Sequence, residues 1–365
     1  MSFFIGESFL IPVPRTEAPL DAPPLGWGII GPGRIASTFV ESLTAHTRQR
    51  IVAVGSRSID TALNFAKRFD GCNAVGSYEE LVKHPAVDIV YVSTPHSSHH
   101  QCVMLALEAG KHVLVEKPFA INAEQAREMA QRAKQKGLFL MEAMWPRFLP
   151  AFDSVRQILS AGILGEVTSV VADLGEYFRP DPAHRLFSPD LAGGALLDLG
   201  VYLVSLSSLL AGAPSRITAV GEFTSTGVDA QVCAILENNR GALSSLFTTL
   251  GAPTPTAAFI AGTKGTLRLD SPFYVPGRIT VTSLDRSVER TREFAIRTPA
   301  AALCYEAAEA ARQITQGSTE SPYLPLQESV AIIETLDRIR EQIAPGSYTH
   351  ARPTPEESDN LCQKH

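Results

Sequence analysis

Short apolar runs alternate with amphipathic stretches of helical period between Leu25 and Glu142. The apolar runs predict strands at Trp27–Ile30, Ile51–Gly55, Val87–Ser93, His112–Val115 and Leu138–Met141. The stretches between them predict helices at Arg34–Ala45, Ile59–Phe69, Ser98–Ala109 and Ala123–Lys136. Strands that alternate with helices of this length form parallel βαβ units, whose sheet is covered by helices on both faces. Residues 25–148 are therefore predicted to form one α/β domain.

After Pro150 the pattern changes to two helices that flank one strand, followed by a long series of strands and two closing helices. The predicted helices are Phe152–Ala161, Gly194–Leu210, Ala300–Thr315 and Leu326–Gln342. The predicted strands are Val167–Ala172, Arg216–Gly221, Gln231–Glu237, Ala242–Thr249, Thr256–Ala261, Thr266–Asp270, Arg278–Ser283 and Arg290–Ile296. Short strands joined by turns favour an open, mostly antiparallel sheet. Residues 149–350 are thus predicted to form an α+β domain with helices on one face of that sheet.

The two ends of the chain differ from these domains. Residues 1–24 contain prolines at positions 12, 14, 19, 23 and 24 and are predicted to form an arm before the first strand. Two interpretations of this arm stay open: it embraces a partner subunit, or it is disordered. Residues 351–365 are polar and are predicted to form a loose tail.

Composition and charge exclude several classes of function. The 365 residues include 32 Lys and Arg against 38 Asp and Glu, a net charge of −6, without a basic run. Because binding to phosphate backbones normally needs a basic stripe, nucleic acid is not expected as a partner. The longest apolar stretch, near Ala195–Ala213, contains Asp198 and three serines, which indicates a buried helix and not a membrane span. Five cysteines without a C-x-x-C pair, and no basic segment at the N-terminus, predict a cytoplasmic protein with free thiols.

A glycine-rich turn follows the first predicted strand and opens the first helix: Gly31-Pro-Gly33-Arg34-Ile35-Ala36. The first glycine permits the tight turn, the second lets the backbone approach a pyrophosphate, and the small Ala36 lets helix and strand pack closely. The helix N-terminus then presents free N–H groups to the phosphates. In this strand–turn–helix context the pattern predicts a Rossmann dinucleotide-binding domain.

The end of the second predicted strand decides between NAD and NADP. An acidic residue there binds the ribose 2′-hydroxyl of NAD, whereas an arginine accommodates the 2′-phosphate of NADP. The strand runs into Ser56 and Arg57, and the first acidic residue is Asp60. We therefore predict NADP as the cofactor, held by Arg57 with Ser56.

Lys117 follows the apolar strand that ends at Val115, in the segment Glu116-Lys117-Pro118. This position lies at the carboxyl edge of the parallel sheet, where ligands of such folds bind. A lysine there can hold a substrate hydroxyl or carbonyl and depress the pKa of a neighbouring acid–base group. An exposed lysine at the start of a loop is the alternative interpretation.

Five segments together resemble the glucose–fructose oxidoreductase/inositol dehydrogenase/MocA family of nicotinamide oxidoreductases. They are Gly31–Ala36, Ser93–His99, Ala109–Pro118, Met141–Phe148 and Gly193–Tyr202, and the resemblance covers about residues 25–345. The last two look most like dimeric dihydrodiol dehydrogenases and NADP-dependent D-xylose 1-dehydrogenases. Thr61 stands where some NADP-dependent relatives carry a second phosphate-binding arginine, so the use of NAD as well stays possible.

The resemblance implies roles for three residues. Lys117 matches the family's catalytic lysine, Tyr202 its acid–base residue, and Asp198 its acidic position one helical turn earlier. Residues four apart share one face of a helix, so Asp198 and Tyr202 can point into one cleft. The ammonium of Lys117 is expected to lower the pKa of Tyr202. The alternative for Tyr202 is a core tyrosine in an apolar helix.

Further residues are expected near the cofactor or substrate. The resemblance implies that Thr94, Pro95, His96, His99 and Glu116 line the cofactor site, and no metal ion is expected. Trp145 and Arg147 are predicted beside the nicotinamide, and Trp145 and Phe178 beside the substrate together with Lys117, Asp198 and Tyr202. Packing between the domains is the alternative for Trp145, Arg147 and Phe178.

These observations favour an NADP-dependent oxidoreductase that transfers hydride between the nicotinamide and a hydroxyl-bearing carbon. The expected substrate is a small sugar, such as the aldopyranose D-xylose, or a trans-dihydrodiol. One alternative is a non-catalytic NADP-sensing regulator of the same fold, which has no reason to keep both Lys117 and Tyr202. An inositol or nucleotide-sugar dehydrogenase is another, although inositol-type relatives usually carry histidine where Tyr202 stands. A homodimer or larger homo-oligomer through the open face of the second sheet is also expected.

Overall fold

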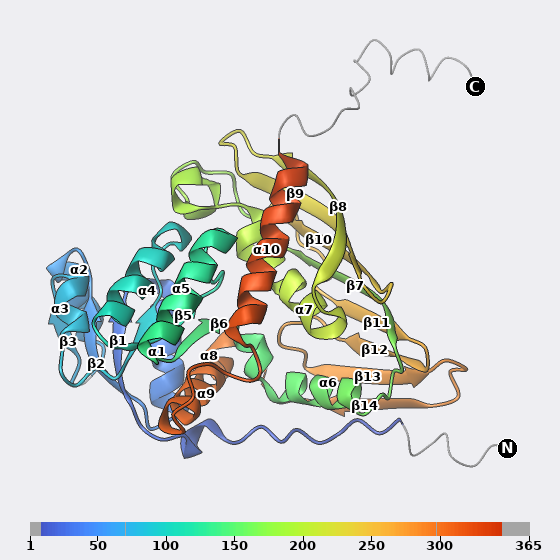
Figure 1. The fold of residues 1–365 in the computed structure, drawn as a ribbon, viewed down its shortest axis with the longest axis horizontal. Coiled ribbons are helices and arrows are strands. Elements are labelled where there is room, and N and C mark those ends of the chain that lie inside the picture. The colour runs from blue at the N-terminus through green and yellow to red at the C-terminus, as the bar shows by residue number, and fades with distance from the viewer. Residues whose placement is uncertain (1–8, 70, 297, 345–365) are drawn as a thin grey trace, which may run out of the picture.

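The computed structural model describes residues 9–69, 71–296 and 298–344, which form two domains side by side (Figure 1). In the first domain six parallel strands follow the order β3-β2-β1-β4-β5-β6. They are β1 (Gly26–Ile30), β2 (Arg50–Gly55), β3 (Asn73–Val75), β4 (Ile89–Val92), β5 (His112–Glu116) and β6 (Leu140–Ala143). This order reverses direction beside β1, and ligands of such sheets bind at the carboxyl ends of the strands there.

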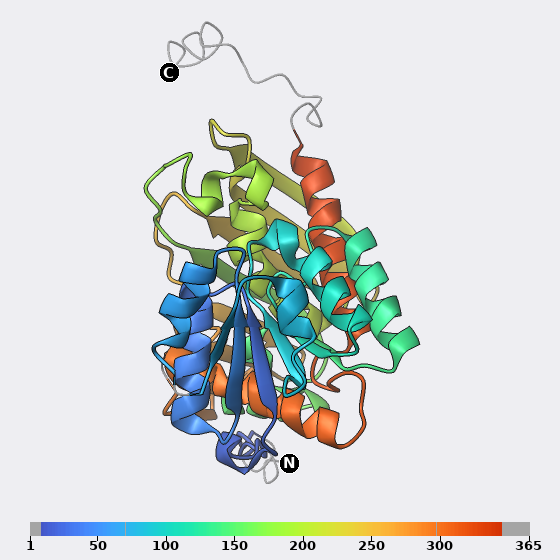
Figure 2. The same cartoon turned by 90° about the vertical axis from the view of Figure 1, so that its left-hand side faces the viewer.

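Helices cover both faces of this sheet, as Figure 2 shows. They are α1 (Arg34–His46), α2 (Ile59–Ala66), α3 (Tyr78–Val82), α4 (His99–Glu108) and α5 (Ala123–Lys136). Because both faces are covered, every residue of β1 and β4 is buried, which explains their unbroken apolar runs. The sequence did not predict β3 and α3, because three and five residues are too short to show a period.

The second domain contains eight strands in the order β14-β13-β12-β11-β7-β10-β9-β8. They are β7 (Val167–Gly175), β8 (Pro214–Phe223), β9 (Asp229–Asn238), β10 (Leu243–Thr249), β11 (Ala258–Gly262), β12 (Gly265–Leu269), β13 (Arg278–Ser283) and β14 (Glu289–Glu293). All neighbours are antiparallel except β7 and β10. The helices α7 (Val201–Ala211) and α10 (Leu326–Ile343) pack against one face, and α6 (Pro150–Ser160) joins the domains. The predicted fold class is confirmed.

The chain returns to the first domain after its last strand. The helices α8 (Pro299–Ala302) and α9 (Cys304–Thr315) pack against α1, and α10 lies between α5 and β8 (Figure 1). The sequence grouped these helices with the second sheet, because a linear pattern does not show which earlier element a helix packs against. The predicted tail, 351–365, lies outside the described residues.

The described part of the N-terminal arm, residues 9–24, runs along both domains (Figure 1). Phe9 and Ile11 are buried. Several side chains bond its backbone: among them, Ser154 Oγ donates to Pro12 O at 2.9 Å, Asp153 Oδ2 accepts from Arg15 N at 2.6 Å, and Arg312 Nη2 donates to Ala18 O at 2.7 Å. Residues 9–24 are thus ordered against their own chain, and contact with a partner subunit stays a prediction.

One helical stretch among the described residues, Pro189–Ala211, is long and apolar enough to cross a membrane. Of its most apolar window, 78% is buried inside this protein. The stretch is a core helix packed against β7 and β10, as its serines and Asp198 had indicated.

Candidate active site

The glycine-rich turn lies between β1 and α1, and the space beside Gly33 is open. Gly31 has a φ of +88°, and a Cβ there would lie 2.9 Å from the backbone that follows β4. A Cβ on Gly33 would meet no atom within 4 Å, Arg34 and Ile35 are exposed, and Ala36 is buried. The turn therefore offers open space at a helix N-terminus, which fits a pyrophosphate.

Ser56 and Arg57 follow β2 directly and differ in exposure. Ser56 is buried, and its hydroxyl accepts the backbone N–H of Ser58 at 3.2 Å. Arg57 is exposed. The side chain is therefore free to meet a phosphate at the carboxyl edge of β2.

Lys117 and Asp198 meet across the two domains. Lys117 Nζ donates to the backbone oxygen of Asp198 at 2.8 Å and to its Oδ1 at 3.2 Å. Arg185 Nη2 donates to the same Oδ1 at 3.1 Å, and His96 Nε2 lies 3.7 Å from it. Burial raises the pKa of Asp198, but Lys117 and Arg185 outweigh it and hold this pKa well below its usual range. Asp198 is thus a permanent carboxylate that orients two cations.

Tyr202 lies beside this pair and contacts two aromatic side chains, Trp145 and Tyr274. Trp145 Nε1 donates to Tyr202 Oη at 3.1 Å, and the Tyr274 ring centroid lies 5.5 Å from that of Tyr202. Lys117 Nζ lies 4.9 Å from the centroid of the Tyr202 ring. The predicted constellation is therefore brought together in one place.

The expected direction of the Tyr202 pKa is wrong. Burial and the negative charge of Glu116 raise this pKa well above its usual value, and Asp198 adds to the increase. The ammonium of Lys117 is itself paired with Asp198, so its effect on the phenol is offset. Tyr202 consequently holds its proton at neutral pH.

The segment that carries Asp198 has an unusual backbone. A Cβ on Gly193 would lie 2.5 Å from a backbone oxygen, and one on Gly194 would lie 2.3 Å from Asp229 Oδ1. Asp229 Oδ2 accepts the N–H of Leu196 at 2.6 Å and anchors the start of the helix. The sequence predicted a regular helix from Gly194, but Leu196–Gly200 is π-helical. Such turns occur often at functional sites.

The histidines of the segment after β4 are held by backbone oxygens. His99 is buried with Nδ1 2.9 Å from Pro118 O and Nε2 3.0 Å from Thr94 O. His96 Nδ1 lies 3.1 Å from Ala192 O. Burial lowers the pKa of His96 to about 3 and that of His99 to about 4, so both rings are neutral at pH 7. His96 thus connects the segment after β4 to Ala192, and His99 connects it to the residues that follow β5. Within 9–69, 71–296 and 298–344, no three His, Cys, Asp or Glu converge as a metal site would require.

Three other predicted site residues are held by contacts outside the Lys117–Asp198–Tyr202 cluster. Arg147 is buried. Its guanidinium donates to Ser205, to the backbone oxygen of Tyr323 and to the carboxylate of Glu328. It therefore joins η3 (Trp145–Phe148) to α7 and α10. Phe178 stacks on His184, with ring centroids 6.2 Å apart. The Glu116 carboxylate is buried and accepts the hydroxyl of Tyr91.

Sequence reasoning missed Arg185 and Tyr274. Arg185 lies in a short 3₁₀ turn, and Tyr274 lies between β12 and β13. Both reach the cluster from segments without a recognisable motif. Only the contacts with Asp198 and Tyr202 reveal them.

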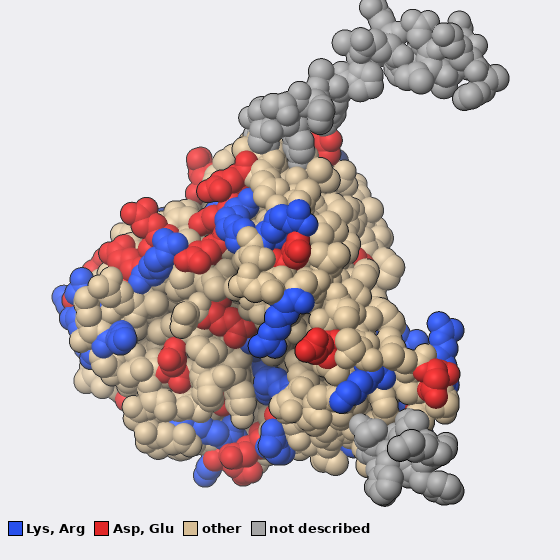
Figure 3. All heavy atoms as spheres, turned by 45° about the vertical axis from the view of Figure 1, so that its right-hand side comes forward, with Lys and Arg blue, Asp and Glu red and all other residues tan. Residues whose placement is uncertain are grey.

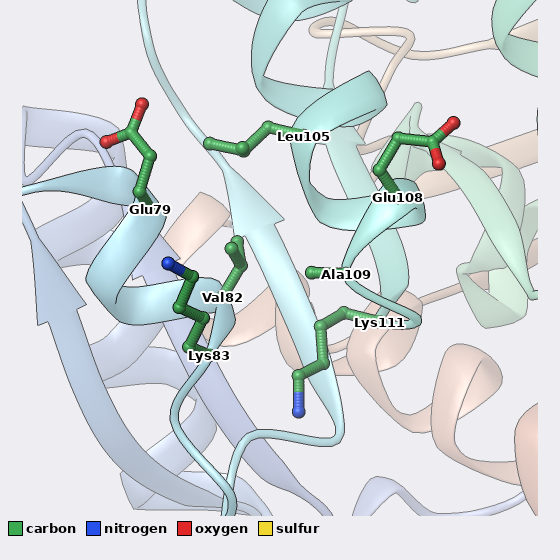
Figure 4. A pocket seen from close by; sticks show the side chains of 7 residues that line it. All are labelled: Glu79, Val82, Lys83, Leu105, Glu108, Ala109 and Lys111. Carbon is green, nitrogen blue, oxygen red and sulfur yellow. The ribbon is translucent and has the colours of Figure 1, made fainter.

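A separate hollow of about 380 Å³ lies between α3 and α4 (Figure 4). Glu79, Val82, Lys83, Leu105, Glu108, Ala109 and Lys111 line it. Lys111 Nζ is bonded to the backbone oxygens of His84 and Val87 at 3.2 and 2.7 Å. Lys111 precedes β5, so this hollow lies at the amino edge of the sheet, opposite the cluster around Lys117.

Comparison with known proteins agrees with this arrangement. Residues 25–144 match a model described as the oxidoreductase family, NAD-binding Rossmann fold, and residues 152–268 match the GFO/IDH/MocA C-terminal domain. The chain belongs to the GFO/IDH/MocA oxidoreductase family. Its first domain is thus an NAD-binding Rossmann domain, and the chain is an oxidoreductase.

Relatives in this family include trans-1,2-dihydrobenzene-1,2-diol dehydrogenases. The Bos taurus protein is 37% identical over 327 residues, which cover 87% of this chain and 97% of the relative. The Homo sapiens protein is 36% identical over 328 residues, with the same coverage. A similar solved structure is KijD10, a 3-ketoreductase from Actinomadura kijaniata in complex with NADP and TDP-benzene. It has a TM-score of 0.76 and 27% identity and covers 87% of this chain and 98% of its own.

Proposed function

We propose that this protein is an NADP-dependent oxidoreductase that interconverts a hydroxyl and a carbonyl group on a small sugar or a trans-dihydrodiol. The observation that carries the proposal is the meeting of Lys117, Asp198 and Tyr202 at the carboxyl edge of the first sheet. A dihydrodiol is supported by the dihydrodiol dehydrogenases at 37% identity, and an aldopyranose such as D-xylose stays the other candidate.

A bound nicotinamide dinucleotide supplies the hydride acceptor or donor. Lys117 holds the reacting oxygen with its ammonium, whose position Asp198 sets through two hydrogen bonds. Tyr202, protonated at neutral pH, donates a proton to a carbonyl oxygen during reduction, and its phenolate accepts one during oxidation. Trp145 orients the phenol through its indole N–H.

A panel assay tests this proposal. Reduction of NADP and NAD would be followed with D-xylose, D-glucose, levoglucosan, myo-inositol and a trans-dihydrodiol, and the reverse reaction with the matching carbonyl compounds. Turnover on an aldopyranose or the dihydrodiol supports the proposal. Turnover on myo-inositol alone would favour the inositol alternative, and tight NADP binding without any turnover would favour a sensor.

Arg57→Ala is expected to weaken NADP binding by about 10–100-fold, because one charge-assisted contact to the 2′-phosphate is lost. Affinity for NAD should stay nearly unchanged, since NAD has no phosphate there. Fluorescence titration with each cofactor measures the ratio of the NADP affinity to the NAD affinity. Arg50→Ala removes an exposed arginine from the other end of β2 and serves as the matched control. An NADP/NAD ratio equal to that of the unmodified protein would refute the role of Arg57.

We also propose that a second copy of the chain covers the open face of the eight-stranded sheet. Five exposed apolar side chains lie there on adjacent strands: Val171, Val220, Ile235, Leu243 and Phe259. Figure 3 shows a broad uncharged area on this side of the molecule. Apolar patches of this kind mark association surfaces, and two identical patches can pair about a two-fold axis.

Val171→Glu should shift the protein from dimer to monomer in sedimentation, because it places a charge at the centre of this face. Leu284→Glu alters an equally exposed apolar residue in the β13–β14 turn and should leave the dimer intact. A monomeric unmodified protein would contradict the proposed dimer.

A further inference from the structure

A buried carboxyl group, Glu306, lies in the first domain and takes no part in the cluster described above. It stands in the first turn of α9, which packs against α1 and β5. Its side chain is completely buried, and neither carboxyl oxygen has a hydrogen-bond partner among the described residues. An ionised carboxylate in such surroundings is very unfavourable, so Glu306 carries a proton in this state.

A second buried carboxyl group, Glu116, lies at the end of β5 near Glu306. Glu116 Oε1 accepts the hydroxyl of Tyr91, and its Oε2 accepts the backbone N–H of Lys117 at 3.2 Å. Burial raises the pKa of Glu306, and the charge of Glu116 adds to the increase. Glu116 also raises the pKa of Tyr202. The two carboxyl groups are thus both buried where α9 packs against β5, and Glu116 bonds the backbone of Lys117.

Few other charges face the pair. Tyr91, on β4, is neutral because burial and Glu116 raise its pKa well above its usual value. Arg147, on η3, has its guanidinium bound to Glu328. The α1 helix contributes Ser42, which accepts the N–H of Cys304 at 3.0 Å. Among the described residues near the pair, the remaining charges are the Lys117 ammonium and the Asp198 carboxylate, which are bonded to each other.

We propose that the Glu116–Glu306 pair is a proton acceptor coupled to the redox state of the bound nicotinamide. The pair holds one proton while the neighbouring ring is neutral and releases it when the positively charged, oxidised ring binds. In the oxidation of an alcohol, the C–H hydride passes to the oxidised nicotinamide, and the C–O bond becomes a carbonyl. The alcohol gives up its hydroxyl proton, and the pair takes up one proton as the ring loses its charge. The inference rests on dinucleotide binding but not on the identity of the substrate.

The physical basis of this coupling is the charge on the nicotinamide ring, which is positive when the ring is oxidised and absent when it is reduced. A positive ring at the carboxyl edge of β5 lowers the pKa of carboxyl groups behind it, whereas a neutral ring does not. Release of a proton on binding means that affinity for the oxidised cofactor, relative to the reduced one, rises with pH.

Calorimetric titration with NADP⁺ and with NADPH, each in phosphate and in Tris buffer, counts the protons released on binding. The unmodified protein should release roughly half to one proton more with NADP⁺ than with NADPH at neutral pH. The ratio of the two affinities should change by up to about tenfold per pH unit. In Glu306→Gln the difference should disappear, since the amide cannot ionise. Glu116→Gln should remove it as well and covers the case that one variant fails to fold.

Glu142→Gln is the matched control. Glu142 is also buried, and burial raises its pKa to about 7, but its oxygens are bonded to Phe119 N and Ser329 Oγ. This variant should keep the difference between the numbers of protons released with NADP⁺ and with NADPH. Equal proton counts for both cofactors in the unmodified protein, or a difference that survives in Glu306→Gln, would overturn the inference. Tyr202→Phe should keep the difference as well, so failure of the proposed chemistry and failure of this inference are distinguishable.

Discussion

Replacing Tyr202 with phenylalanine is expected to lower kcat by about 10²–10⁴-fold while cofactor binding stays nearly unchanged. The phenylalanine ring keeps the contact with Tyr274 and loses only the hydroxyl bonded to Trp145 Nε1. Steady-state rates in both directions and fluorescence titration with the dinucleotide measure the two effects. Tyr305→Phe alters another partly buried tyrosine, on α9, and should keep the turnover of the unmodified protein. Near-normal turnover in Tyr202→Phe would remove this residue from the chemistry.

The raised pKa of Tyr202 gives this site a definite pH dependence. Carbonyl reduction needs the protonated phenol, so its rate should stay level through neutral pH and fall only in alkaline solution. Alcohol oxidation needs the phenolate, so its rate should rise with pH over the same range. Profiles of kcat against pH in the two directions check this, and an oxidation rate that falls between pH 7 and pH 9, roughly, would contradict it.

Replacing Lys117 with alanine should lower kcat/KM by about 10²–10³-fold, because the ammonium that holds the reacting oxygen is lost. The pKa of Asp198 should rise, since Lys117 is the largest of the charges that lower it. Lys117→Arg should not restore activity, because a planar guanidinium cannot occupy the place of a compact ammonium between Asp198 and the Tyr202 ring.

Lys111→Ala is the control for this variant. Lys111 precedes the same strand, β5, but bonds backbone oxygens at the opposite edge of the sheet. Its loss should lower the free energy of unfolding by about 1–3 kcal/mol and leave turnover intact. Equal losses of turnover in both lysine variants would mean that Lys117 acts through stability alone.

Several features of the fold followed from local pattern. Apolar runs such as β1 and β4 are buried on both faces, so their composition alone identified parallel strands. Gly31 indicated the dinucleotide turn, because only a residue without a Cβ fits its positive φ and its close approach to the backbone that follows β4. The order of five motifs then placed the chain in its family, which the matching models confirm.

The candidate site was visible only in part. Lys117, Asp198 and Tyr202 were found because each lies in a motif, and their roles stay predictions. Arg185, Tyr274 and Glu306 lie in segments without a motif. The first two are recognised only by their contacts with Asp198 and Tyr202, and Glu306 only by its burial without a hydrogen-bond partner among the described residues. The direction of the Tyr202 pKa could not be predicted, because it depends on burial and on Glu116, which is distant in sequence.

The sequence by itself determined most of the strands and helices, the phosphate-binding turn and the family, because these depend on residues close together in the chain. Only the tertiary structure decided which charges meet, which protons stay bound and where the N-terminal arm lies. Those properties depend on distances between residues far apart in sequence, and on the exclusion of water where the two domains meet at Lys117 and Asp198 and where α9 buries Glu306.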